Sequence, residues 1–205
     1  MPWKQVEIDF ENPILRQMLD RHFPAQDPVI LRQHGGATPG QCYTNVRNTV
    51  SRHGGEAVLC YVFSWWPGLF IEALHHAIWK SPSGDLIDIT APAYPAIRQG
   101  TATLAVLLPE ELQILDPMVP SIFWAISKSR IVSQYIDASI DASIAKDRLN
   151  KAAQRFAVDA ASMAEIKRHQ TRVQAACTQR AKAIAGMEEK FGRKSWQNAT
   201  ELCRP

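Results

Sequence analysis

The sequence predicts an α+β domain followed by an all-α extension. Between residues 42 and 90, one segment of helical character precedes three segments whose apolar and β-branched composition is typical of strands. After Pro120 the composition changes, because no proline or glycine occurs from Ser121 to Ala185 and helix-forming residues are frequent. The predicted division is an α+β core of residues 1–120 and a helical extension of residues 121–205.

Length and composition predict a globular chain of one ordinary domain with an appendage. The 205 residues are 46% hydrophobic and 21% charged, which argues against global disorder. No apolar run approaches the ~20 residues that a membrane helix needs. The N-terminal stretch MPWKQVEIDF lacks the charged-then-apolar profile of a signal peptide. We therefore expect a cytoplasmic protein that does not contact a membrane.

The cysteines give no metal pattern. They stand at positions 42, 60, 177 and 203, with no CxxC pair and no regular ligand spacing. In a reducing cytosol they are expected to be free thiols. A zinc site built from Cys42, Cys60 and the two adjacent histidines would have no standard spacing. We expect neither a metal nor a cofactor.

Charge is unevenly distributed along the chain. Residues 129–205 hold 14 Lys or Arg and 8 Asp or Glu, whereas residues 1–128 hold 9 and 12. A basic helical extension on a mildly acidic body suits contact with an acidic partner, or a solvated helical face. Because positive and negative residues are interleaved, the solvated face is the simpler expectation.

The first part of the core begins with a short helix. In NPILRQMLDRHF, Asn12 is a capping residue and Pro13 suits the first helical position. HGGATPG, residues 34–40, has the composition of a loop. A second helix is predicted from Cys42 to His53, where Gly54 and Gly55 provide a strong stop signal.

Three strands then follow in close succession. EAVLCYVFSWW, FIEALHHAIWK and DLIDIT read as strands, separated by the turn sequences PGL and SPSG. APAYPAIRQG, with two prolines, is predicted to be a loop, and a short helix is expected to begin at Pro109.

The extension is too long for one ordinary helix, which usually runs under ~20–25 residues. Apolar residues recur every four positions at Ile136, Ile140 and Ile144, without a strict heptad. An antiparallel helical hairpin is therefore favoured over a protruding coiled-coil arm.

Cys42 stands where a nucleophile would be placed. A helix N-terminus offers unsatisfied N–H groups and the positive end of the helix dipole, and both favour thiolate over thiol. The preceding glycine-rich segment leaves room for a substrate. A buried, unreactive cysteine is the alternative at this position, since cysteine is among the most buried residue types.

A base and an orienting acid are predicted on the following hairpin. His75 and His76 lie in one strand, and Asp88 lies in its partner. Directly paired residues face the same side of a hairpin. If the loop around SPSG has three or five residues, His76 shares a face with Asp88. With two or four loop residues, His75 takes that place.

These residues resemble the transglutaminase-like and papain-like cysteine hydrolase superfamily. GQCY is similar to the Gly-Gln-Cys-aromatic motif of transglutaminases, HAIW to the histidine strands of both groups, and DIT with Pro92 to their Asp-x-Thr-Pro. The resemblance, over about residues 35–93, implies a helix that carries the nucleophile and packs on a small antiparallel sheet. It implies Cys42 as nucleophile, His76 as base in preference to His75, and Asp88 as the orienting acid.

The expected function is that of a thiol-dependent hydrolase (peptidase, amidase or deamidase) or an acyltransferase. Its substrate would contain an amide or ester, as peptides and proteins do, and would be attacked by Cys42. The backbone N–H of Cys42 is the first candidate for an oxyanion donor, with the side chains of Gln33 and Gln41 as further candidates.

The alternative is a non-catalytic papain-like scaffold, whose basic helical extension binds a protein or nucleic-acid partner or self-associates. No aromatic-basic recognition motif supports nucleic acid, so a protein partner is expected ahead of it.

Overall fold

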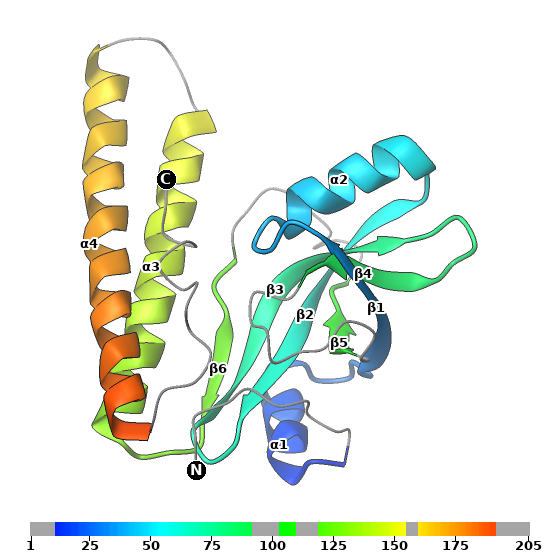
Figure 1. The fold of residues 1–205 in the computed structure, drawn as a ribbon, viewed down its shortest axis with the longest axis horizontal. Helices are drawn as coiled ribbons and strands as arrows, with labels where there is room; N and C mark the ends of the chain where they lie inside the picture. The colour runs from blue at the N-terminus through cyan, green and yellow to red at the C-terminus, as the bar shows by residue number, and fades with distance from the viewer. Residues whose placement is uncertain (1–10, 92–102, 110–118, 155–159, 192–205) are drawn as a thin grey trace. The chain divides into compact units, whose positions relative to one another are not determined.

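The computed structural model describes residues 11–91, 103–109, 119–154 and 160–191 (Figure 1). It divides into an α+β unit, which takes in Ile122–Ile126, and a helical unit whose main segment begins at Ser127. The mixed α+β class agrees with the prediction. In chain order the elements are α1 Pro13–His22, β1 Val29–Ala37, α2 Cys42–His53, β2 Glu56–Trp66, β3 Phe70–Lys80, β4 Leu86–Thr90, β5 Thr103–Leu107, β6 Ile122–Ala125, α3 Arg130–Gln154 and α4 Ala160–Phe191.

Five strands of the α+β unit close into a barrel. β2 and β3 form a long antiparallel hairpin, β3 pairs antiparallel with β4, and β4 lies parallel to β1. β5 pairs antiparallel with both β1 and β2, which completes the circle. The small antiparallel sheet that the resemblance implies is therefore corrected to a barrel with one parallel pair.

Side chains alternate between the inside of the barrel and its outer surface, as the strand pleat requires. One buried cluster draws only on strands, and Leu86 of β4 packs against it. Its members are Leu31, Cys60, Val62, Ile78 and Ala105. Since all five barrel strands contribute to this cluster and no helix does, it forms the interior of the barrel.

Two helices cover the outer surface of the β2–β3 hairpin (Figure 1). α1 buries Leu15 and Met18 in a cluster with residues of β2, β3 and β5. Asn12 begins this helix as predicted, since its Oδ1 accepts the backbone N–H groups of Ile14 and Leu15 at 2.9 and 3.2 Å. α2 buries Val46 in a cluster with residues of β2, β3 and β4.

The sequence does not predict strands β1, β5 and β6, and β6 contradicts the predicted helical extension. β1 runs to Ala37, through residues that the sequence assigns to a loop, and β5 has only five residues. The prediction that the helical extension begins at residue 121 is wrong, because β6 pairs with Phe70–Ala73 of β3. The α+β unit thus continues past residue 120. The absence of proline and glycine permits a helix, but the sequence IFWA suits a strand once an edge is available. The loop predicted at 91–100 and the helix predicted from Pro109 fall almost wholly outside the described residues.

The helical unit consists of α3 and α4, which run antiparallel. Lys190, near the end of α4, donates to Ser129 Oγ just before α3 at 2.9 Å, and Arg180 donates to Ser139 Oγ at 3.2 Å. Gly186 allows a close approach, since a Cβ there would lie 2.7 Å from the Ile131 side chain. Neither these helices nor the others that the structure describes combine the length and apolarity needed to cross a membrane.

Gly55 is expected to be the least replaceable glycine between α2 and β2. It has φ +82, and a Cβ would lie 2.3 Å from the Lys80 carbonyl oxygen. Gly55→Ala should therefore destabilise the fold by more than the roughly 1–2 kcal/mol that a left-handed conformation costs. Gly68→Ala is the matched control, because Gly68 has φ +74 and nothing within 4 Å of its Cβ position. Urea denaturation of both variants measures the difference. Equal losses would contradict the steric argument.

Candidate active site

The N-terminus of α2 places Cys42 at the first helical position. Gln41 precedes the helix, and its carbonyl accepts the N–H of Asn45 at 2.8 Å to begin the helical bonding. The helix contains twelve residues, so its dipole presents a positive end to the half-buried thiol.

The Cys42 thiol lies near the His76 ring and the backbone N–H groups of Ala77 and Tyr43, and all three act on its pKa. Burial alone would raise the pKa of the thiol. The hydrogen bond and positive charge of His76, with the two backbone donors, outweigh that effect and lower the pKa below its ordinary value. The local environment thus favours a thiolate at Cys42.

His76 is held between Cys42 and Asp88. Its Nε2 lies 2.9 Å from Asp88 Oδ1, and the Cys42 thiol is near enough to act on the same ring. Burial alone would lower the pKa of His76. The hydrogen bonds and negative charges of Asp88 and Cys42 outweigh it and raise the pKa to about 10. These opposite shifts favour a thiolate–imidazolium pair.

Strand register selects His76 rather than His75. Trp79 pairs with Ile87 and Lys80 with Leu86, which is the register that a three- or five-residue loop predicts. His76 therefore shares a face with Asp88, and the predicted hydrogen bond between them is present. The structure brings together Cys42, His76 and Asp88 from α2, β3 and β4.

His75 points to the opposite face of β3. It is buried, its Nδ1 is hydrogen-bonded to the Tyr43 hydroxyl, and its ring meets the Tyr61 ring edge-on with 5.3 Å between centroids. Burial and the charge of His76 lower the pKa of His75 to about 4. A neutral imidazole in a hydrogen bond on the far face is not placed to serve Cys42 as a base.

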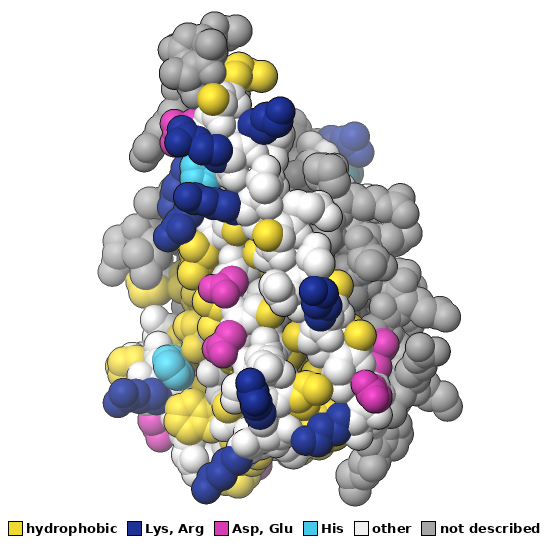
Figure 2. Space-filling model, turned by 90° about the vertical axis from the view of Figure 1, so that its left-hand side faces the viewer, with side chains coloured by type: hydrophobic (Ala, Val, Ile, Leu, Met, Phe, Trp, Pro, Cys, Tyr) yellow, Lys and Arg dark blue, Asp and Glu magenta, His cyan; other side chains and the backbone are white. Residues whose placement is uncertain are grey.

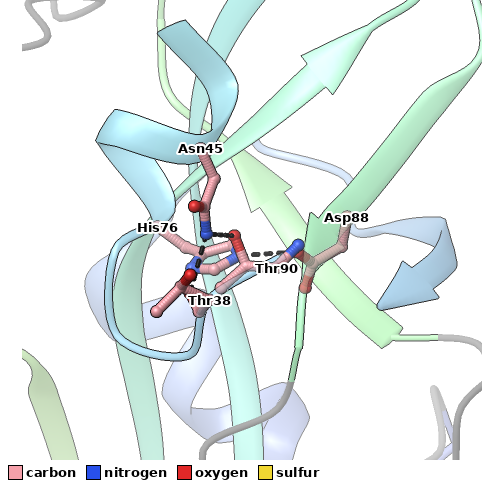
Figure 3. A network of polar contacts seen from close by, with 5 residues as sticks. All are labelled: Thr38, Asn45, His76, Asp88 and Thr90. Atoms are coloured by element: carbon pink, nitrogen blue, oxygen red, sulfur yellow. Dashed lines mark hydrogen bonds and ion pairs between the residues drawn. The ribbon is translucent and has the colours of Figure 1, made fainter. Parts of the chain in front are cut away.

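A network of polar residues surrounds the pair and was missed by the sequence analysis (Figure 3). Thr90 donates its backbone N–H to Asp88 Oδ1 at 3.0 Å. Asn45 Nδ2 donates to Thr90 Oγ1 at 3.2 Å and to the Thr38 carbonyl at 2.8 Å. Spacing could have indicated both residues, since Asn45 lies one helical turn after Cys42 and Thr90 shares a strand face with Asp88.

Cys60 is a second thiol close to the site, with a different character. It is fully buried inside the barrel and pairs with His76 in the β2–β3 register. Burial, with the negative charges of Asp88 and Cys42, raises the pKa of Cys60 well above its ordinary value. Cys60 should therefore react far more slowly than Cys42 with thiol reagents.

The other candidates from the sequence have separate places. Gln33 is buried beside Asp88 in the β1–β4 pair, and Gln41 is exposed before α2. Pro92 lies outside the described residues. Within the described ranges, no group of three or more His, Cys, Asp or Glu is arranged to hold a metal ion.

Thiolate, protonated imidazole and buried carboxylate in hydrogen-bonded order can perform nucleophilic addition to a carbonyl, followed by proton transfer to the leaving group. Comparison of the chain with family models, curated proteins and solved structures gives no match to any of the three.

Proposed function

We propose that this protein is a thiol-dependent enzyme that transfers the acyl group of an amide or ester to water or to an amine. The observation that carries the proposal is the position of His76, which is hydrogen-bonded to Asp88 and lies near enough to Cys42, at the start of a helix, for each group to shift the pKa of the other. A cysteine and histidine with shifted pKa values and a buried carboxylate partner are characteristic of activated nucleophiles.

The reaction would run in two steps. The Cys42 thiolate adds to the carbonyl carbon, and the oxyanion accepts the backbone N–H of Cys42. His76 gives a proton to the departing amine or alcohol, which leaves a thioester on Cys42. His76 then takes a proton from the incoming water or amine, and the acyl product leaves as the thiolate returns. Hydrolysis is the simpler outcome, because it needs no acceptor other than water.

The same proposal includes the kind of core and the class of substrate. Motif order and the packing of the Cys42 helix on a sheet support a transglutaminase-like or papain-like core. One parallel strand pair and the barrel closure are features that a relationship to that superfamily must accommodate. Peptides and proteins are the proposed substrates, since their amides are the bonds such a site attacks.

Labelling with a thiol-reactive probe tests the proposal. In the full chain, iodoacetamide should alkylate Cys42 with a pH inflection below ~7.5, compared with ~8.5 for an ordinary thiol. Peptide mass spectrometry separates Cys42 from the buried Cys60 and Cys177, which should react slowly. A fluorescent warhead probe should label the wild type but not Cys42→Ala. An ordinary inflection at Cys42, with no selectivity over the other thiols, would rule out the nucleophile.

A second candidate function rests on the helical unit. Figure 2 shows Lys and Arg side chains over the face that carries α4, with Asp and Glu between them. Exposed basic residues on this helix are Lys167, Arg168, Arg172, Lys182 and Lys190. Such a surface supports binding of an acidic protein partner, and a Cys42→Ala variant that keeps the full biological activity would favour it.

A further inference from the structure

A second contact joins the same two elements as the Cys42–His76 pair. Tyr43 follows Cys42 in α2, and His75 precedes His76 in β3. The Tyr43 hydroxyl is hydrogen-bonded to His75 Nδ1, and the two ring centroids lie 6.0 Å apart. Two consecutive residues of the helix thus meet two consecutive residues of the strand, one pair on each face of β3.

The first turn of α2 is also anchored to β4. Asn45 is buried, and its Nδ2 reaches Thr90 Oγ1 of β4 at 3.2 Å and the Thr38 carbonyl at 2.8 Å (Figure 3). Thr90 in turn holds Asp88 through its backbone N–H. The same turn that carries Cys42 is therefore linked to the strand that carries Asp88.

We propose that Tyr43 and Asn45 are positioning residues, which hold the first turn of α2 against β3 and β4 and so keep the Cys42 sulfur in hydrogen-bond reach of His76. The proposal rests on the proposed function, because a fixed sulfur–imidazole distance matters only if Cys42 is a nucleophile. Hydrogen bonds weaken steeply with misalignment, so a slip of the helix by about 1 Å would remove most of the activation.

The Tyr43–His75 contact is suited to this role because both of its groups stay neutral while Cys42 and His76 gain or lose protons. Burial, with the charge of Cys42 and other nearby thiol and phenol groups, raises the pKa of Tyr43, and burial lowers the pKa of His75 to about 4. Both groups are neutral at the pH values where a thiolate–imidazolium pair forms. Their hydrogen bond therefore persists while Cys42 and His76 change protonation state.

Isosteric variants test the proposal in the full chain. Tyr43→Phe removes the hydroxyl, and Thr90→Val removes the acceptor of Asn45 while keeping the backbone N–H to Asp88. The readout is the pH dependence of Cys42 alkylation by iodoacetamide, with the melting temperature measured alongside. Each variant should raise the inflection by about one pH unit, which reduces the thiolate fraction roughly tenfold at pH values well below the inflection.

Matched controls separate positioning from general packing. Tyr61→Phe removes a hydroxyl from a ring that meets the same His75 edge-on, and should leave the inflection unchanged. Thr90→Ser keeps the hydroxyl and should also leave the inflection of Cys42 alkylation unchanged. His75→Leu should give the same shift as Tyr43→Phe. The variant with both substitutions should give no larger shift, because each substitution removes the same Tyr43–His75 hydrogen bond.

Each outcome decides the question. If the wild type shows a low inflection and Tyr43→Phe and Thr90→Val lower only the melting temperature, the two residues are structural and the proposal is overturned. If the wild type itself shows an ordinary inflection, the proposed function fails, and the positioning role of Tyr43 and Asn45 fails with it. Should Tyr43→Phe not fold, Thr90→Val alone decides.

Discussion

Replacement of His76 by glutamine is expected to turn Cys42 into an ordinary or weaker nucleophile and to slow release of an acyl group by about 10²–10⁴-fold. Burial raises the pKa of Cys42, and the imidazole is the main group that offsets it. Without the imidazole, the thiol inflection should move to ~8.5 or above. Glutamine keeps a donor for Asp88, so the variant should still fold.

Hydrolysis of p-nitrophenyl acetate by the full chain measures both steps. The wild type should release p-nitrophenol in a burst and then turn over as His76 activates water. His76→Gln should show a slower burst at neutral pH and an acetyl-enzyme that persists in intact-mass spectrometry. His75→Gln is the matched control, because residue 75 faces the other side of β3 and the glutamine Oε1 can still accept the Tyr43 hydroxyl, so this variant should keep near wild-type turnover. A His75→Gln variant that is inactive beside an active His76→Gln would reverse the assignment.

The same pair sets the pH limits of turnover. The imidazolium is needed as an acid, and the pKa of His76 is raised to about 10, so activity that depends on it is present at neutral pH and is lost as pH rises through about 10. On the acid side, activity is lost as Cys42 is protonated, below the ordinary range of a thiol. In His76→Gln the alkaline loss should disappear.

The sequence predicts much of the site because strong local signals determine it. Helix α2 and strands β2 and β3 have the predicted bounds, since long apolar runs are punctuated by Gly54, Gly55 and Pro67. The SPSG loop fixes the register of β3 and β4, and the register determines which histidine faces Asp88. Pleat alternation reduced the choice to two registers, one for each histidine, and only the family resemblance favoured His76 before the structure showed the register.

The remaining features depend on long-range pairing, which a local pattern does not contain. β1 includes Arg32, Gln33 and His34, and is a strand because β4 and β5 pair with its two edges. β6 exists because β3 extends beyond the barrel. Asn45 was missed because a polar residue in the first turn of a helix is ordinary, and only the nearness of Thr90 gives it a role.

Replacement of Asp88 by asparagine is expected to lower turnover by a factor on the order of 10⁴, as the equivalent substitution does in serine protease triads. Asp88 is buried, and its Oδ1 accepts from both His76 Nε2 and the Thr90 N–H. A neutral amide that keeps this geometry loses the charge that helps to raise the pKa of His76. An amide turned to donate forces the ring proton onto Nδ1, where it opposes acceptance of a proton from water. Either orientation weakens the thiolate–imidazolium pair.

Asp85 supplies the control for this substitution. It lies in the exposed turn before β4, where it accepts the Ser83 hydroxyl at 2.8 Å. Asp85→Asn should leave turnover of p-nitrophenyl acetate and the Cys42 inflection close to wild type. Asp88→Asn should keep the fold by circular dichroism, raise the Cys42 inflection and lower the turnover. If Asp88→Asn stays folded and matches Asp85→Asn in both measurements, then Asp88 only satisfies a buried hydrogen bond. His76 would have to act without an orienting acid, as a dyad with Cys42.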